Sequence, residues 1–356
     1  SDGTAANALS VPASALDLRS EELRAAVAIQ EAHTAELMSR AGVVGTAVGV
    51  DETGSPAVKV YLEDESALAM VPAELDGMAV QAVITGPLVP RGGNGGMGGM
   101  GGSGSDPRAP QTAPIKLGTS GGWRYDLANG YCCGGTLGAL VEDGGGTQYI
   151  LSNNHVLYGD IVNGGNGTVA SAGDPVIQPA LIDVGCNANS AMNVATLVNG
   201  GGSLPGNNLD AGIAEVIPGQ VASDGEILEI GVLSSQTTGA FVGQDVKKMG
   251  RTSGLGRGTV DGLNATVSIT YEDECAGGVA FTQTYTGQVI ITNARCRFLD
   301  GGDSGSVMVE DVTTNPRAVG LLFAGSVNCN KFAIAIASPI DEVLNFYGGG
   351  MQMVGN

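Results

Sequence analysis

Beyond about residue 113, the chain alternates short apolar runs with turns rich in glycine, asparagine and aspartate. Runs of this length between turn residues are typical of β-strands. The pattern predicts strands at residues 137–141, 149–152, 176–177, 211–216, 227–230, 265–271, 287–291, 306–309, 318–323 and 332–336. Little helix is expected before residues 339–347. Many short strands with so little helix indicate a β-barrel or β-sandwich architecture.

The first 90 residues show a different pattern. Ser20 can cap a helix that runs from Glu21 to about Arg40, and Gly42 offers a C-terminal stop. His33 lies at the margin of the apolar face of this helix, where a packing or surface role is expected. Strands are predicted to follow at residues 43–50, 57–62 and 79–84. Residues 1–90 are therefore expected to form a small α+β unit, either an accessory domain or one resembling a propeptide.

Residues 91–112 separate the two patterns. Their first part consists almost entirely of glycine, with asparagine, serine and two methionines. Such a composition cannot bury a core and is typical of a flexible tether. We expect a Gly-rich linker here, with a β-rich domain covering residues 113–356.

Composition narrows the functional classes. The 356 residues carry 16 Lys and Arg against 36 Asp and Glu, a net charge of -20. This acidity argues against nucleic acid or an anionic lipid surface as the main partner. The longest apolar runs fall short of the roughly 18–20 residues that a membrane-spanning helix needs, so we expect no membrane span.

The cysteines bear on compartment and on metal binding. None of the six forms a CxxC pair, and the chain holds only two histidines, so we expect neither a zinc site nor another metal site or cofactor. The even count favours disulfides, with Cys275 and Cys296 as one candidate pair, although free buried thiols are an alternative. Disulfides would favour a secreted or cell-exterior protein. Residues 1–15 lack the features of a signal peptide, which leaves an intracellular location open.

A candidate nucleophile lies in the stretch from Leu299 to Val307, which reads Leu-Asp-Gly-Gly-Asp-Ser-Gly-Ser-Val. Ser304 is flanked by glycines, as a nucleophile on a tight turn would be. Gly-Asp-Ser-Gly is also ordinary turn chemistry, so the assignment requires a base and an acid on a suitable scaffold.

The base and the acid can be chosen within the same domain. His155 follows an apolar strand and is the only histidine there, so it is the only imidazole available to Ser304. Asp210 ends a polar loop and introduces an apolar strand, where its carboxylate could accept the imidazole N–H. Asp174 and Asp183 are rivals, but neither introduces so apolar a strand.

The order His155, Asp210, Ser304 and the motifs around these residues resemble the trypsin-like, chymotrypsin-fold serine peptidases, especially the bacterial group. The matching motifs are Cys133-Gly-Gly-Thr-Leu, Leu151-Ser-Asn-Asn-His, Asn207-Asn-Leu-Asp, Gly250-Arg-Thr-Ser-Gly and Gly302-Asp-Ser-Gly. The resemblance covers residues 113–348. It implies a mainly β, two-barrel chymotrypsin-like peptidase domain, with six strands in each barrel and the site between them.

The resemblance also implies a mechanism and an oxyanion site. Ser304 would attack an acyl carbonyl while His155 takes its proton and later returns it to the leaving amine. The backbone N–H groups of Gly302 and Ser304 would stabilise the oxyanion.

The specificity pocket implied by the resemblance departs from that of trypsin. Phe298 and Leu299 stand where trypsin selects basic side chains with an aspartate, so cleavage after Lys or Arg is not expected. Residues Phe323, Ala324 and Gly325 would form the strand that pairs with the substrate backbone, and they lack the histidine seen in glutamate-specific relatives. A pocket for small or medium apolar residues is expected.

Asp303 raises the question of activation. In zymogen-activated relatives the equivalent aspartate pairs with a newly released N-terminal amine. Cleavage near residues 113–115 would then make residues 1–112 a propeptide. The alternative is an accessory domain on a spacer, which can contact the peptidase domain, with Asp303 hydrogen-bonded locally.

These observations predict a serine endopeptidase that acts on peptides or proteins through a Ser-His-Asp triad and an acyl-enzyme. One alternative is an inactive peptidase fold that binds peptides. Another is an esterase that uses the same triad.

Overall fold

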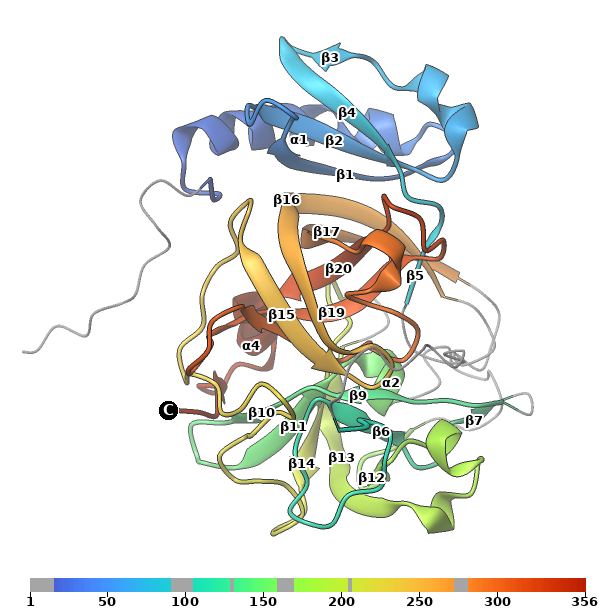
Figure 1. Ribbon diagram of the computed structural model, residues 1–356, viewed down its shortest axis with the longest axis vertical. Helices are drawn as coiled ribbons and strands as arrows, with labels where there is room; N and C mark the ends of the chain where they lie inside the picture. The colour runs from blue at the N-terminus through green and yellow to red at the C-terminus, as the bar shows by residue number, and fades with distance from the viewer. Residues whose placement is uncertain (1–15, 91–104, 129–130, 159–169, 204–206, 272–280) are drawn as a thin grey trace, which may run out of the picture.

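The computed structural model describes residues 16–90, 105–128, 131–158, 170–203, 207–271 and 281–356, and shows three stacked parts (Figure 1). An N-terminal α+β unit lies against one of two β-barrels, and the other barrel lies on the far side of that one.

The N-terminal unit packs one helix against a small sheet. Its elements are α1 (Glu21–Met38), β1 (Val43–Val50), β2 (Pro56–Leu62), η1 (Glu65–Met70), β3 (Glu74–Leu75), β4 (Met78–Ile84) and β5 (Leu88–Pro90). Helix α1 begins as the sequence predicts, because the Ser20 hydroxyl accepts a hydrogen bond from the Leu23 amide. The expected strand β1 is present with the expected bounds.

The first barrel follows the linker. It contains β6 (Thr119–Trp123), β9 (Gly135–Leu137), β10 (Ala139–Glu142), β11 (Gln148–Ser152), β12 (Pro175–Gln178), β13 (Met192–Gly202) and β14 (Gly212–Val216), with β21 (Gln352–Met353) added at one edge. Apart from β21, the sheet runs from β10 at one edge to β9 at the other. Only Gly138 separates β9 from β10 along the chain, so the two edges meet and the sheet closes into a barrel. The short hairpin of β7 (Leu127–Ala128) and β8 (Tyr131–Cys132) lies outside this sheet, as do α2 (Asn154–Leu157), η2 (Leu181–Val184) and η3 (Ala188–Ser190).

The second barrel has the strand order β15-β18-β19-β20-β17-β16, and the pairing of β15 with β16 closes it. These strands are β15 (Asp245–Gly250), β16 (Gly254–Tyr271), β17 (Phe281–Thr292), β18 (Val307–Glu310), β19 (Ala318–Ser326) and β20 (Ile334–Pro339). The short η4 (Ala294–Cys296) precedes the candidate nucleophile turn, and α4 (Ile340–Tyr347) leads back toward the first barrel.

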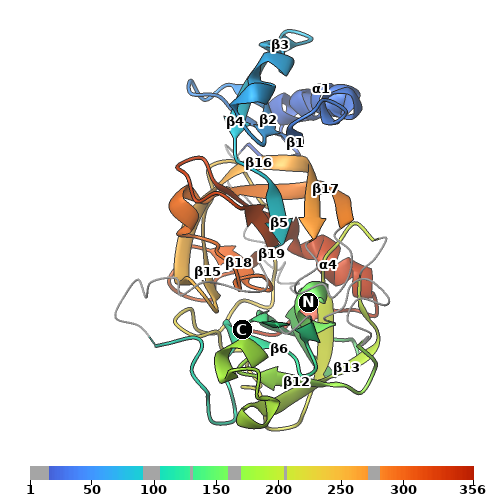
Figure 2. The same cartoon turned by 90° about the vertical axis from the view of Figure 1, so that its right-hand side faces the viewer.

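Two strand pairings join the N-terminal unit to the second barrel. Strand β1 pairs antiparallel with β16, so the small sheet continues that of the barrel. Strand β5 pairs antiparallel with β19, and Figure 2 shows β5 descending from the N-terminal unit to this strand. An ion pair of 2.6 Å between Lys59 and Asp261 adds a side-chain contact beside the β1–β16 pairing.

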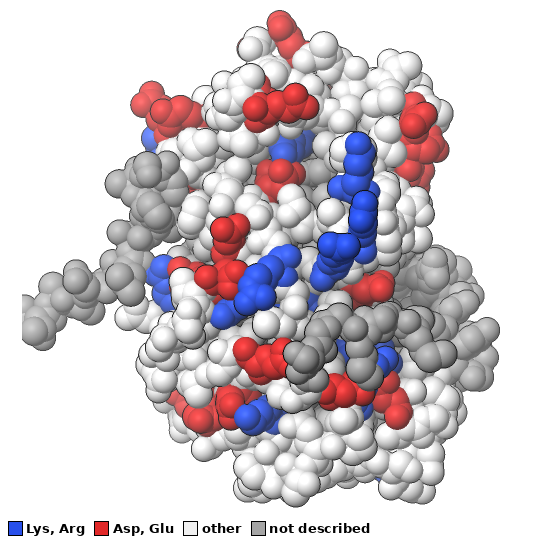
Figure 3. Space-filling model, viewed as in Figure 1, with Lys and Arg blue, Asp and Glu red and all other residues white. Residues whose placement is uncertain are grey.

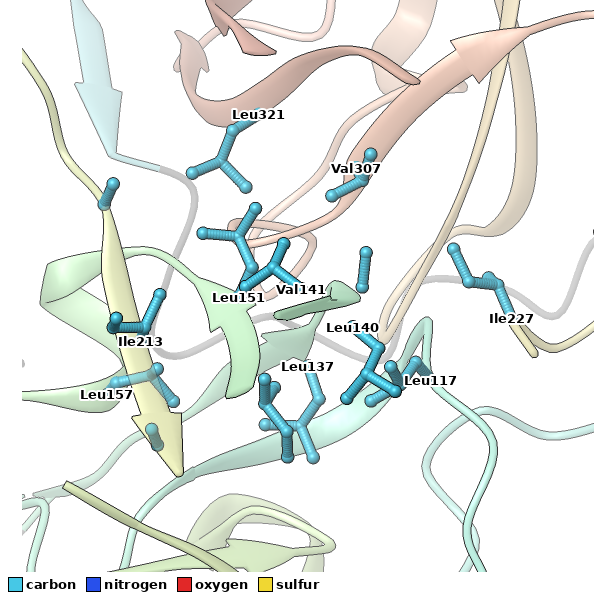
Figure 4. Close-up of a cluster of buried hydrophobic side chains, with 14 of the residues drawn as sticks. Leu117, Leu137, Leu140, Val141, Leu151, Leu157, Ile213, Ile227, Val307 and Leu321 are labelled. Carbon is cyan, nitrogen blue, oxygen red and sulfur yellow. The ribbon is translucent and has the colours of Figure 1, made fainter. Parts of the chain in front are cut away.

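A shared apolar core holds the two barrels together. Leu137, Leu151 and Ile213 from the first barrel belong to the same buried cluster as Val307 and Leu321 from the second (Figure 4). Burial of apolar side chains on both sides of this junction fixes the relative position of the loops that carry the candidate site.

The prediction of a mainly β, chymotrypsin-like fold is confirmed. The eleven-stranded sheet exceeds the expected six strands because β1 to β5 of the N-terminal unit extend it. The predicted strand at 227–230 is wrong, because this segment forms a tight turn in which the Ile230 and Gly231 amides both donate to the Ile227 carbonyl. Residues 105–111 of the expected linker bind the first barrel, where the Gln111 amide donates to the Gln178 side chain at 3.0 Å.

The disulfides differ from the predicted pair. Cys296 bonds Cys329 rather than Cys275, and Cys132 bonds Cys186. Cys133 is also disulfide-bonded, whereas Cys275 lies outside the described residues. The prediction failed because sequence spacing does not show that η4 and the loop after β19 come close together.

Acidic side chains are spread over all levels of the face in Figure 3, whereas basic ones gather mainly on the middle barrel. Within the described parts of the chain, every helix is too short or too polar to cross a membrane.

Candidate active site

The turn that carries Ser304 lies between η4 and β18, where the two barrels meet. Gly302 and Gly305 both have positive φ angles, +95° and +91°. A Cβ atom at Gly302 would lie 2.5 Å from the Thr252 hydroxyl, and one at Gly305 would overlap the Ser152 side chain. The turn therefore requires glycine on both sides of the Asp303-Ser304 pair.

His155 and Asp210 are brought together by α2 and by the loop before β14. The imidazole Nδ1 lies 2.6 Å from Asp210 Oδ2, and the His155 backbone N–H donates to Asp210 Oδ1 at 3.2 Å. The Asn153 side chain donates to the Asp210 carbonyl at 2.6 Å. A carboxylate held in this way fixes the imidazole with Nε2 free to act as a base.

The Ser304 hydroxyl points to the strand β19. It donates to the Phe323 carbonyl at 3.0 Å, and the residue is fully buried. His155 is 8% exposed, and its buried Nε2 has no hydrogen-bond partner among the described residues. Nucleophile and base therefore share the site without being hydrogen-bonded to each other.

The amides of Gly302 and Ser304 donate to no acceptor within the described part of the chain. The first barrel fixes the peptide groups around them. The Thr136 hydroxyl donates to the Gly302 carbonyl at 2.9 Å, and the Thr136 amide donates to the Ser304 carbonyl at 2.9 Å. Two available N–H groups beside a serine hydroxyl suit a developing oxyanion.

Asp303 has a buried cationic partner. Lys248 Nζ lies 3.0 Å from Asp303 Oδ2, and both side chains are fully buried. The amides of Thr252, Ser253 and Asp300 also donate to this carboxylate, as does the Ser253 hydroxyl. Burial alone would raise the pKa of Asp303, but the charge of Lys248 and these hydrogen bonds hold it below its usual value.

This ion pair changes the interpretation of Asp303. The Asp303 carboxylate is neutralised within the unbroken chain, so no newly released amine is needed to pair with it. Asp303 is therefore paired and hydrogen-bonded locally within the intact chain.

The predicted pocket residues lie together but play different parts. Phe298 and Leu299 belong to the buried cluster of the second barrel. A Cβ at Gly325 would lie 3.2 Å from Leu299 Cδ2, so Leu299 backs the β19 strand, while Phe298 packs near Gly258 and Ile291. The Phe323 ring packs against Tyr285 at 4.9 Å between centroids, and its carbonyl faces the site.

The chain itself covers the edge of β19 that the sequence analysis expects to pair with substrate. Pro90 pairs with Ala324, Val89 with Gly325, and Leu88 with Ser326. The Val327 amide donates to the Pro87 carbonyl at 3.0 Å. Because hydrogen-bonded pairs alternate along an antiparallel ladder, the next hydrogen-bonding position is Val89 opposite Gly325.

Two tyrosines that the sequence motifs do not mark also lie at the site. Tyr271 donates to Asp210 Oδ2 at 2.7 Å, and its hydroxyl lies 2.5 Å from that of Tyr285. A tyrosine on a β-strand carries no motif that separates it from a packing residue. Their position on the paired strands β16 and β17 indicates that they lie together, but seeing this requires knowledge of the strand register.

Asp174 and Asp183, the alternative candidates for the acid, have partners outside the site. Asp174 accepts from the Trp123 indole at 3.1 Å, and Asp183 forms a two-pronged ion pair with Arg251 through contacts of 2.6 Å. Neither contacts His155.

Comparison with known proteins bears on the fold and the family of this chain. Residues 182–343 match the family described as the Nal1 C-terminal domain. Streptogrisin-A of Streptomyces griseus is 36% identical over 130 residues, which cover 36% of this chain and 38% of that protein. The chain thus spans well under half the length of this relative. The aligned part supports homology to chymotrypsin-type serine proteases and a bacterial trypsin-like peptidase fold.

Solved structures give weaker likenesses. A glutamic acid-specific serine protease superposes with a TM-score of 0.45 at 22% identity, covering 67% of this chain and 100% of that one. Thermobifida fusca Protease A gives a TM-score of 0.40 at 21% identity, covering 68% and 99%.

Proposed function

We propose that this chain, which has the fold of the bacterial trypsin-like peptidases, is a serine endopeptidase that uses Ser304, His155 and Asp210. The observation that carries the proposal is the 2.6 Å contact between His155 and Asp210 in the same site as a serine on a glycine-bounded turn. An inactive peptide-binding fold would have no need of all three groups. The two described disulfides favour an oxidising, extracellular compartment.

In the proposed reaction, the incoming substrate rearranges the nucleophile. A substrate backbone N–H bonds the Phe323 carbonyl and displaces the Ser304 hydroxyl, which turns to His155 Nε2. Ser304 Oγ then attacks the acyl carbonyl as His155 takes its proton, and the Gly302 and Ser304 amides bind the oxyanion. His155 returns the proton to the leaving amine, and water hydrolyses the acyl-enzyme by the reverse path.

The substrate is proposed to be a peptide rather than a simple ester. Strand β19 offers a row of backbone groups to a partner strand, and β5 already binds them in that way. Leu299 behind Gly325 favours a small or medium apolar side chain at the residue before the cleaved bond.

We expect a fluorophosphonate probe to label the protein at Ser304. The probe reacts with a serine that an adjacent base activates, so Ser304→Ala and His155→Ala should both lose the label. Peptide mapping by mass spectrometry locates the adduct, and a peptide library then shows whether amide bonds are cut. Labelling that persists in Ser304→Ala would contradict the assignment. Labelling without peptide cleavage would favour the esterase.

The N-terminal unit is proposed to be a propeptide-like inhibitor rather than a passive accessory domain. Strand β5 lies along the edge of β19 that a substrate needs, so the two compete for the same backbone groups. The Gly-rich segment that follows β5 joins the two units covalently, which keeps the local concentration of β5 high.

Replacing Val89 with proline is expected to speed probe labelling of the intact chain about fivefold. Proline removes the N–H that faces Gly325, and one backbone hydrogen bond is worth about 1 kcal/mol. Val89→Ala keeps that N–H and serves as the matched control. Equal labelling rates in Val89→Pro, Val89→Ala and the unaltered chain would show that β5 does not limit access.

A further inference from the structure

The β16–β17 hairpin delivers two phenols to the acid of the proposed triad. Tyr271 is the last residue of β16, and Tyr285 lies on β17, where it sits opposite Val267. The Tyr271 hydroxyl donates to Asp210 Oδ2, the same oxygen that contacts His155 Nδ1. Both tyrosines are buried, with exposed fractions of 1% and 0%.

The direction of these hydrogen bonds follows from counting protons. A phenol has one proton, and Tyr271 gives its proton to the Asp210 carboxylate. The 2.5 Å contact between the two hydroxyls must therefore use the proton of Tyr285. Tyr285 donates to Tyr271, and Tyr271 donates to Asp210, which strengthens the second hydrogen bond by polarising it.

Packing holds the two rings in place. Tyr271 stacks on Phe281 with ring centroids 4.8 Å apart and meets the His155 ring edge-on at 6.2 Å. Tyr285 packs against Phe323, whose carbonyl accepts from Ser304. Burial, the charge of Asp210 and the neighbouring phenol all raise the pKa of Tyr271 well above its usual value, so it stays a donor at neutral pH.

We propose that Tyr271, supported by Tyr285, is a positioning residue that sets the basicity of His155 through Asp210. This inference rests on the proposed function for its catalytic meaning. The Tyr271 donor withdraws negative charge from Asp210 Oδ2 and so weakens the pull of the carboxylate on the imidazole proton. His155 is thereby a weaker base than it would be beside Asp210 alone.

Asp210 is the main charged partner of His155, because the other titratable groups near this carboxylate are neutral tyrosines. Among the described residues, the titratable groups that interact with Asp210 are His155, Tyr271 and Tyr285, together with the buried Tyr347, which also interacts with Tyr158. The tyrosines are neutral at physiological pH, because burial raises the pKa of each of the four.

Tyr271→Phe is expected to raise the pKa of His155 by about 0.5–1 unit, since the carboxylate then keeps its full charge for the imidazole. Tyr285→Phe should cause a smaller shift in the same direction, because the Tyr271 donor remains. NMR titration of the full chain measures this directly. The chain has two histidines, and His33, which pairs with Asp76 at 2.9 Å, gives an internal reference.

Kinetics give a second readout. The acidic limb of the pH profile of kcat/KM should move to higher pH in Tyr271→Phe by the same amount as the NMR shift, because the imidazole must be neutral to act as the base. A His155 pKa and pH profile unchanged in Tyr271→Phe, with turnover retained, would overturn the positioning role and leave the proposed function intact. A shifted His155 pKa in a chain without turnover would support the positioning role while the proposed function fails.

Discussion

Asp210→Asn is expected to lower kcat for peptide hydrolysis about 10⁴-fold, as the same change of the triad aspartate does in a chymotrypsin-fold serine protease. Asp210 accepts the His155 Nδ1–H at 2.6 Å and the His155 backbone N–H at 3.2 Å, and it also accepts from Tyr271. An amide in its place must turn an NH₂ group toward one of these donors. The imidazole would then favour the tautomer whose Nε2 carries the proton, which cannot act as a base.

The measurement is steady-state hydrolysis of a peptide substrate by folded protein. Asp174→Asn is the matched control, because Asp174 holds the Trp123 indole within the same barrel and does not contact His155. The control should retain turnover. If Asp210→Asn also retained turnover within about tenfold, another residue would have to orient His155.

The second large effect concerns stability. Lys248→Met is expected to lower the free energy of unfolding by about 3–5 kcal/mol, because it leaves the Asp303 carboxylate buried without its cation. Chemical denaturation at neutral pH measures the difference. Since Asp303 also orders the turn before Ser304, the variant should label slowly at Ser304 even where it remains folded.

A double variant, Lys248→Met with Asp303→Asn, separates lost charge from lost packing. Removing both charges should recover most of the stability, because a neutral pair carries no ion to desolvate. The pKa of Asp303 is held below its unfolded value of about 3.9, so its contribution is present above that pH and is lost as pH falls. The double variant should lack this acid-dependent part. Equal destabilisation in the single and double variants would contradict the ion-pair account.

The sequence predicted the parts of the site that depend on local chemistry. Ser304 is marked by its glycines, and His155 is the only imidazole of its domain, so local sequence was enough to make them candidates. The bounds of β1 and the start of α1 were likewise encoded in a short, nearly continuous apolar run and in the Ser20 cap.

Features that depend on register could not be predicted in this way. Lys248 appears as one of two adjacent lysines on a strand, and only the barrel, in which β15 pairs with both β16 and β18, brings it beside Asp303. The Cys296–Cys329 disulfide joins two loops whose proximity depends on the barrel rather than on spacing. The place of β5 on β19 brings together segments more than 230 residues apart in sequence, and nothing in Leu88-Val-Pro indicates its partner.

The pairing of β1 with β16 affects how stable the peptidase domain would be if the N-terminal unit were separated from it. Residues Gly45 to Gly49 cover the outer side of β16 between Gly262 and Val267. Removing them would leave that side as a bare edge, able to recruit a strand from another molecule. The same hairpin carries Tyr271 and Tyr285, so distortion of this edge by self-association would reach the acid of the proposed triad. A peptidase domain without the N-terminal unit would therefore lose activity faster at higher protein concentration.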